Sequence, residues 1–591
     1  MLLPVPVPRE GEHVTAQSAA GSTADDRPDD GDDVVAAGLD MLLTDAALGP
    51  LRRMLPGASG LKLAAALATK PASLVRRGVS LATELGRIGL GRSEIAPDAE
   101  DRRFTDPAWT GNGLLRRLVQ THIAATGAAT DLVDDADLDR VDDERVRFAV
   151  ANISDALAPS NNPLLNPVAW RAALDTRGRS AVEGLRRLAD DLSSPPRVPS
   201  MVEPDAFEIG EDLAATPGAV VLRTPVFELI QYLPQTREVR DVPVLIVPPM
   251  INKYYLADLA PGRSIVEHLV QGGQQVFLIS WRNPEAEHAE WDLDTYGQAV
   301  LDAMDACERI TRVTRTALMG FCSGGLITAM LLAHLAAIGL QDRVAAVAFA
   351  ATVLDQDGAG TTGATLDEAT ARAATEASAA KGYLDGRTLT EVFAWLRPGD
   401  LIWSHWVGNY LQGKPPKPSH IRYWNTDTAR MTAGLHRDLI GIALTNALLT
   451  PGAAVMLGTP LDLSKIDRDA YVVAGGTDRL CAWQSCYRTT QLIGGKSRFV
   501  LSTSGHIASM VNPPGTADTS FRVTADPVTP GGPADAQTWL ETAGTEDGSW
   551  WPDLLGWLGE RSGGLRDAPP GLGGRGLHAV HPAPGEYVYA R

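Results

Sequence analysis

The segment Gly320-Phe321-Cys322-Ser323-Gly324 constrains the fold of this chain more than any other feature. It stands between an apolar run at residues 315–319, which predicts a strand, and one at residues 326–340, which predicts a helix. A Gly-x-Cys-x-Gly pattern in a strand–turn–helix is typical of a nucleophile elbow, because the sharp turn leaves no room for side chains beside the nucleophile. The central residue is cysteine, which favours thioester chemistry over simple ester hydrolysis.

Further strands are predicted by short, nearly continuous apolar runs at residues 242–247, 275–281, 344–354, 470–474 and 498–502. Helical segments separate most of these runs along the chain. Continuous apolar strands that alternate with helices are typical of a parallel sheet covered on both faces. The predicted fold class is therefore α/β, with a mostly parallel sheet.

Two polar residues stand where partners of Cys322 are expected. Asp478 follows the strand predicted at 470–474, and His506 follows the strand predicted at 498–502. The order nucleophile, acid, histidine, each at the carboxyl end of a strand, is that of an α/β-hydrolase fold. His506 is predicted to take the thiol proton of Cys322, and Asp478 to hold the reactive tautomer of His506.

The tetrahedral intermediate of acyl transfer needs two backbone N–H donors. The N–H of Ser323, directly after the nucleophile, is the first candidate. The loop after the first predicted strand begins with the prolines 248–249, which have no N–H, so Met250 or Ile251 must supply the second donor. We favour Ile251.

Composition divides the chain into seven segments. They are a disordered acidic tail at 1–40, a basic amphipathic segment at 41–99, an N-terminal helical domain at 100–220, the first part of the hydrolase core at 221–355, an inserted cap subdomain at 356–450, the second part of the core at 451–562, and a Gly- and Pro-rich tail at 563–591 that is expected to have little structure of its own.

Two of these segments allow alternative interpretations. The basic residues between 51 and 92 either lie on a lipid or polymer surface or belong to a solvated helix that packs one face on the domain. The aromatic residues of the cap are expected to be core, with a hydrophobic acyl or polymer channel as the alternative. These are Trp395, Trp403, Trp406, Tyr410, Tyr423 and Trp424.

Charge and cysteine content exclude several classes of protein. A formal net charge of -19 argues against nucleic-acid binding. The N-terminus lacks the pattern of a secretory signal, and no apolar run reaches the roughly 18 to 20 residues of a transmembrane helix. Four cysteines in 591 residues form no disulfide framework and indicate a reducing cytoplasm. Cys307 is expected to be a packing residue, and Cys481 and Cys486 structural residues without a metal, since no second pair accompanies them.

Several longer stretches match one protein family in the same order. They are PSNNPLLNP at 159–167, PPMINKYY at 248–255, SWRNP at 280–284, YWN at 423–425, WQSCYR at 483–488, SGHI at 504–507 and NPPG at 512–515. On these stretches the chain resembles the polyhydroxyalkanoate (PHA) synthases from about residue 100 to its C-terminal end. The pair Trp550-Trp551, with LGER at 558–561, resembles the medium-chain-length (class II) branch most.

The resemblance implies an α/β-hydrolase core with a mobile cap and a triad of Cys322, His506 and Asp478. It implies polymerisation of (R)-3-hydroxyacyl-CoA into polyester with release of coenzyme A. No cofactor is implied, because the CoA thioester is the substrate. It also implies a homodimer at the surface of cytoplasmic polymer granules. Alternatives are a thioesterase or other hydrolase with the same triad, and a granule protein without catalysis, against which the intact triad argues.

Two residues depart from the family pattern. Arg479 stands where the family usually has histidine, and a cation there is expected to favour the ionised form of Asp478. Phe321 is larger than the small residue usual before the nucleophile and is expected to narrow the site.

Overall fold

The computed structural model describes residues 57–98, 101–356, 368–396, 398–478, 480–533 and 535–591. Within these residues the central sheet has 11 strands, in the order β17-β16-β15-β14-β9-β8-β4-β7-β2-β1-β21. Their bounds are β1 Gly218–Arg223, β2 Phe227–Tyr232, β4 Val244–Val247, β7 Val276–Trp281, β8 Thr316–Phe321, β9 Val344–Ala350, β14 Ala470–Gly475, β15 Ser497–Ser502, β16 Ser520–Val523, β17 Gly544–Asp547 and β21 His581–Pro582.

The middle of the sheet is parallel, and its strands are the six predicted from apolar runs. Strands β7, β4, β8, β9, β14 and β15 pair in parallel with their neighbours. Their residues are almost all buried, as expected for strands covered on both faces. The outer strands β1, β2, β16 and β17 pair antiparallel. The predicted α/β-hydrolase fold with a mostly parallel sheet is confirmed.

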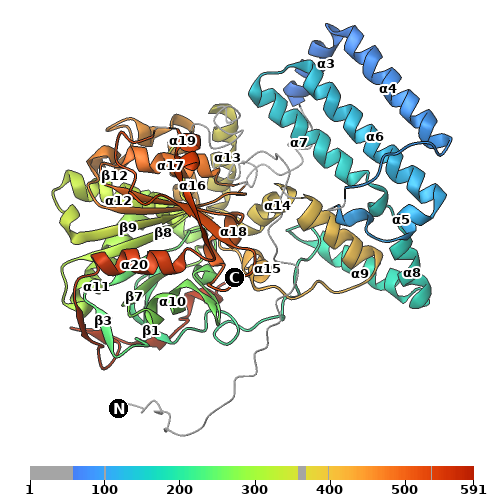
Figure 1. The fold of residues 1–591 in the computed structure, drawn as a ribbon. Helices are drawn as coiled ribbons and strands as arrows, with labels where there is room; N and C mark the ends of the chain where they lie inside the picture. Colours follow the sequence, from blue (N-terminus) through green and yellow to red (C-terminus); the bar gives the residue numbers. More distant parts are fainter. Residues whose placement is uncertain (1–56, 99–100, 357–367, 397, 479, 534) are drawn as a thin grey trace.

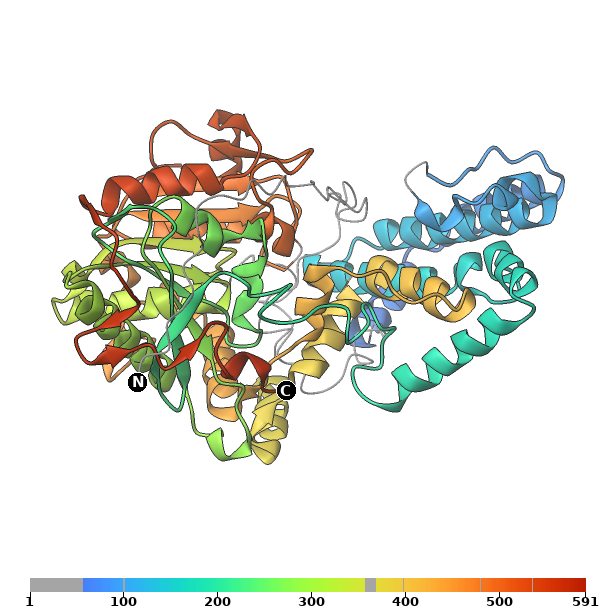
Figure 2. The same ribbon diagram turned by 90° about the horizontal axis from the view of Figure 1, so that it is seen from below.

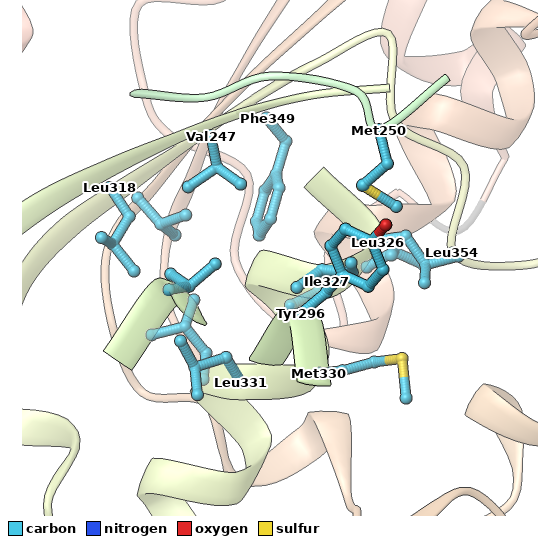
Figure 3. Close-up of a cluster of buried hydrophobic side chains, with 14 of the residues drawn as sticks. Val247, Met250, Tyr296, Leu318, Leu326, Ile327, Met330, Leu331, Phe349 and Leu354 are labelled. Carbon is cyan, nitrogen blue, oxygen red and sulfur yellow. The ribbon is translucent and has the colours of Figure 1, made fainter. Parts of the chain in front are cut away.

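Helices cover both faces of this sheet (Figure 1). One face packs against α10 (Ile265–Gln271) and α20 (Trp551–Arg561), and the other against α11 (Leu293–Thr311), α12 (Ser323–Ala337), α17 (Trp483–Leu492) and α19 (Ala536–Thr542). Helix α12 is apolar on all sides and lies in the interior. Figure 3 shows its residues Leu326, Ile327 and Met330 packed below Val247 and Phe349 of the sheet.

Within the described residues, seven α-helices that precede the sheet form a body beside the core rather than on it (Figures 1 and 2). They are α3 Gly57–Ala68, α4 Pro71–Gly89, α5 Ala108–Gly111, α6 Gly113–Ala136, α7 Arg140–Ala156, α8 Pro167–Asp175 and α9 Arg179–Ser193. Helices α3 and α4, the described part of the basic segment, belong to this body. Arg77 of α4 forms ion pairs with Asp131 and Asp135 of α6. The predicted acidic tail at 1–40 lies outside the described residues.

The insert between β9 and β14 carries α13 (Glu368–Lys381), α14 (Gly386–Leu396), the π-helices η6 (Gly399–Trp403) and η7 (Trp406–Leu411), α15 (His420–Thr426) and α16 (Ala433–Thr445). Its aromatic side chains pack against other parts of the chain. Trp406 donates to the carbonyl of Asn161 at 3.0 Å, and Trp424 donates to the carbonyl of Lys253 at 2.8 Å. These contacts support the core interpretation of the aromatic residues.

The C-terminal tail has more structure than predicted. Strand β18 (Leu565–Asp567) pairs with β3 (Glu238–Arg240), and β21 extends the central sheet beside β1. The fully buried carboxylate of Glu228 accepts the N–H groups of Glu586 and Tyr587, both at 2.9 Å. The expectation of little structure was wrong because backbone pairing and a buried carboxylate order this tail without an apolar pattern. Among the described residues, no helix is both long and apolar enough to cross a membrane.

Candidate active site

Cys322 occupies a strained turn between β8 and α12. Its backbone has φ 49° and ψ -119°, a conformation that non-glycine residues rarely adopt. The N–H of Cys322 donates to the carbonyl of Ala350 at 2.9 Å, and its own carbonyl accepts the N–H of Gly325 at 3.0 Å. Strain of this kind is expected at a nucleophile elbow, where the surrounding structure holds the reactive side chain in an exposed position. The thiol is partly exposed.

The two glycines of the elbow are required for close packing. A Cβ on Gly320 would lie 2.5 Å from the Cα of Gly325, and a Cβ on Gly324 would lie 2.6 Å from the carbonyl oxygen of Pro248. Gly324 therefore allows the loop after β4, which contains Ile251, to approach the N-terminus of α12.

We expect Gly324→Ala to lower both stability and turnover. The added methyl group must push the loop after β4 away from the elbow, at a cost of about 1–3 kcal/mol in the free energy of unfolding. Gly556→Ala is the matched control, because a Cβ on Gly556 of α20 meets nothing within 4 Å. Urea denaturation measures the first effect, and initial rates of the catalysed reaction measure the second. Unchanged stability and turnover in Gly324→Ala would contradict the packing argument.

The structure brings the three predicted site residues together in one line. The Sγ of Cys322 lies 3.4 Å from Nε2 of His506, and Nδ1 of His506 lies 2.6 Å from Oδ2 of Asp478. The other carboxylate oxygen, Oδ1, accepts the N–H groups of Leu480 at 2.8 Å and Cys481 at 2.9 Å. His506 begins the short helix α18 (His506–Val511), after the turn at residues 503–505 that follows β15. The parallel strands β8, β14 and β15 thus place nucleophile, acid and histidine at one edge of the sheet.

Neighbouring charge and burial set the pKa values of His506 and Cys481. Burial of the imidazole acts to lower the pKa of His506, but the neighbouring carboxylate of Asp478 outweighs burial and holds this pKa well above its ordinary value of 6.5. Burial raises the pKa of the Cys481 thiol to about 12. The site therefore stabilises the imidazolium that forms when His506 accepts a proton.

The raised pKa of His506 predicts a pH dependence of stability. The folded state binds this proton more tightly than the unfolded state, so the stabilisation is complete below about pH 6.5 and is lost as the pH rises through the folded pKa. We expect the melting temperature of the wild type to fall more steeply above this pH than that of His506→Gln. Parallel curves for the two proteins would contradict the assignment.

The two predicted oxyanion donors lie on α12 and on the loop after β4, whose Pro248 closely approaches Gly324 of the elbow. Ser323 is the first residue of α12, and Ile251 lies in the turn after β4, which the contact of Gly324 brings to the same helix end. The carbonyl of Ile251 accepts the N–H of Ala429 from the insert at 3.2 Å. Trp281 of β7 donates to the carbonyl of Pro248 at 2.9 Å. The insert and the core therefore both fix the backbone that carries Ile251.

Comparison with known proteins decides the family. A family model described as "alpha/beta hydrolase fold" matches residues 243–513, and one described as "Poly-beta-hydroxybutyrate polymerase (PhaC) N-terminus" matches residues 100–269. The chain is 43% identical over 508 residues to Poly(3-hydroxyalkanoate) polymerase 1 of Ectopseudomonas oleovorans, covering 86% of this chain and 90% of the relative. The chain belongs to the poly(3-hydroxyalkanoate) polymerase family. It is accordingly an acyltransferase.

Two further relatives agree with this placement. Identity is 41% over 513 residues to Poly(3-hydroxyalkanoate) polymerase 2 of the same organism, covering 87% of this chain and 90% of the relative. It is 37% over 509 residues to Poly(3-hydroxyalkanoate) polymerase subunit PhaC of Cupriavidus necator, covering 85% of each. The higher identity to the two Ectopseudomonas polymerases confirms the predicted resemblance to the class II branch.

Five other residues of this polymerase had been singled out in its sequence. Phe321 is 1% exposed and packs within the core; that it narrows the site stays a prediction. Arg479 lies outside the described residues. Cys307 and Cys486 are buried, as expected, but Cys481 is partly exposed beside His506 and Asp478. The sequence did contain a signal for this position, because Cys481 follows Asp478 by only three residues in the same loop.

Proposed function

We propose that this polymerase joins (R)-3-hydroxyacyl groups from CoA thioesters into polyester through a thioester on Cys322. The observation that carries the proposal is the continuous line from the thiol of Cys322 through His506 to Asp478. A thiol, an imidazole and a carboxylate in this order activate the thiol as a nucleophile. That this nucleophile attacks an acyl thioester is inferred from the family.

In the first half-reaction, Nε2 of His506 takes the proton of the Cys322 thiol. The thiolate attacks the substrate carbonyl, and the N–H groups of Ser323 and Ile251 stabilise the resulting oxyanion. The partial positive charge at the N-terminus of α12 also stabilises the thiolate of Cys322. When the intermediate collapses, His506 returns its proton to the departing CoA thiolate. One thioester replaces another, so this step needs little free energy.

In the second half-reaction, the hydroxyl group of another monomer or of the chain end attacks the acyl group on Cys322. His506 takes the hydroxyl proton and returns it to the sulfur of Cys322 as the ester forms. The exchange of a thioester for an oxoester is downhill and drives chain growth. Asp478 is proposed to orient His506, because both of its carboxylate oxygens already accept hydrogen bonds.

The substrate, the oligomeric state and the location in the cell are proposed from the family. The reaction needs no cofactor, because the CoA thioester is itself consumed, and the partners are the acyl-CoA and the growing polyester chain. We propose a homodimer at the surface of cytoplasmic polymer granules, which sedimentation of the protein with and without polymer tests.

Product analysis separates polymerisation from hydrolysis by the same triad. The purified protein is incubated separately with (R)-3-hydroxybutyryl-CoA and with (R)-3-hydroxydecanoyl-CoA, and both free thiol and product are measured. We expect thiol release with insoluble polyester. Thiol release with free 3-hydroxy acid would support a hydrolase instead, and no thiol release would contradict both enzymatic functions.

A further inference from the structure

The loop that carries Ile251 contains a buried lysine that the proposed polymerisation does not use. Lys253, two residues after Ile251, is only 4% exposed. Burial lowers the pKa of its ammonium group to about 8, so the folded state binds this proton less tightly than the unfolded state does. The charge of this side chain therefore costs stability rather than adding to it.

The side chain of Lys253 binds the C-terminal tail. Its Nζ donates to the backbone carbonyl of Ala590 at 2.5 Å. The buried side chain of Asn283, which follows β7, donates through Nδ2 to the same carbonyl at 3.1 Å. The next residue of the loop, Tyr254, donates its hydroxyl to the carbonyl of Pro584 at 3.3 Å. The tail therefore contacts the loop at two successive residues.

The insert is joined to the same two buried side chains. Trp424 of the insert donates to the backbone carbonyl of Lys253 at 2.8 Å. The N–H of Arg430, also in the insert, donates to Oδ1 of Asn283 at 2.9 Å, while Nδ2 of Asn283 donates to the tail. Loop, insert and tail therefore meet at Lys253 and Asn283, close in sequence to the proposed oxyanion donor.

We propose that Lys253 is a positioning residue, which fixes the N–H of Ile251 by holding its loop to the carbonyl of Ala590. This inference rests on the proposed function, in which Ile251 stabilises the oxyanion. A backbone donor must stand at hydrogen-bond distance from the place where negative charge develops, and a misplacement of about 1 Å can cost about 100-fold in rate. Lys253 acts through Ile251 and not on the reacting atoms.

Lys253→Met tests this role in the full chain, because methionine has a similar length and cannot donate a hydrogen bond. We expect kcat for CoA release to fall about 10- to 100-fold while KM changes less than about threefold, since the donor acts on the intermediate. The melting temperature should not fall, because a buried charge is removed. Tyr589→Phe is the matched control: this hydroxyl of the same tail donates to the carbonyl of Ile209, outside the loop, so kcat should stay unchanged.

Amide hydrogen exchange, read by mass spectrometry, follows the loop without any turnover. We expect the peptide that covers residues 249–256 to exchange faster in Lys253→Met than in the wild type and in Tyr589→Phe. Asn283→Ala, which removes the other donor to Ala590, is the second variant and should shift exchange and kcat in the same direction.

Two results would overturn the proposal: unchanged exchange of this peptide in both Lys253→Met and Asn283→Ala, or wild-type kcat in a Lys253→Met protein whose loop does exchange faster. A loss of kcat that only accompanies a lower melting temperature would also count against a positioning role. Faster exchange in the variants of a protein that makes no polymer would contradict the proposed function and leave the link between loop and tail standing.

Discussion

Cys322→Ala is expected to lower CoA release by about 10⁶-fold while the protein stays folded. Removal of a catalytic nucleophile has an effect of this size because the remaining partners cannot act without it. The thiol is partly exposed, so its loss leaves no large cavity. Cys307→Ala, in a fully buried position of α11, should retain activity and serves as the control. Residual activity above about 1% in Cys322→Ala would exclude this residue as the nucleophile.

Cys322→Ser gives a more specific result from the same position. The hydroxyl group can accept an acyl group from CoA, but the acyl-enzyme is then an oxoester. An oxoester is a weaker electrophile than a thioester, and its transfer to another hydroxyl group gains little free energy, so this second step becomes very slow. We expect the serine enzyme to release about one CoA per chain and then to stall.

Asp478→Asn is expected to reduce turnover by about 10⁴-fold. The two N–H groups on Oδ1 will select the amide oxygen of the asparagine, which turns its NH₂ group toward Nδ1 of His506. An NH₂ group there donates to Nδ1 and forces the ring proton onto Nε2. Nε2 then cannot accept the thiol proton of Cys322.

Asp469→Asn is the matched control for this change. Asp469 directly precedes β14, is partly exposed, and pairs with Arg561 far from the thiol, so near wild-type turnover is expected. Initial rates of CoA release measure both variants. Turnover of Asp478→Asn within tenfold of the wild type would contradict the orienting role of Asp478.

The parallel centre of the fold and the triad were predictable because their signals are local. Each inner strand is a continuous apolar run, and Asp478 and His506 follow two of these runs within a few residues. Strand β2 gives no such signal, since it contains Glu228 and Gln231, yet both are buried. The tail that supplies the N–H groups to Glu228 lies more than 350 residues further along the chain.

The short spacing from Asp478 to Cys481 is visible in the sequence, but the place of the Cys481 thiol beside His506 is not. Cys481 and Cys486 were expected to be structural residues without a metal, because no second cysteine pair accompanies them. In the fold this loop turns back on the triad: the N–H groups of Leu480 and Cys481 donate to Oδ1 of Asp478, and the Cys481 thiol lies near His506. The ion pairs of Arg77 in α4 were not predictable either, because their carboxylate partners lie on α6, more than 50 residues further along the chain.

Peptide mapping of the quenched enzyme tests the central claim most directly. The protein is mixed with (R)-3-hydroxyacyl-CoA, stopped in acid within a turnover, digested and analysed by mass spectrometry. We predict one or more 3-hydroxyacyl units on the peptide that contains Cys322, removable by neutral hydroxylamine, and none on the peptides of the other three cysteines. Acyl groups on a different residue, or turnover without any acylated peptide, would contradict the account.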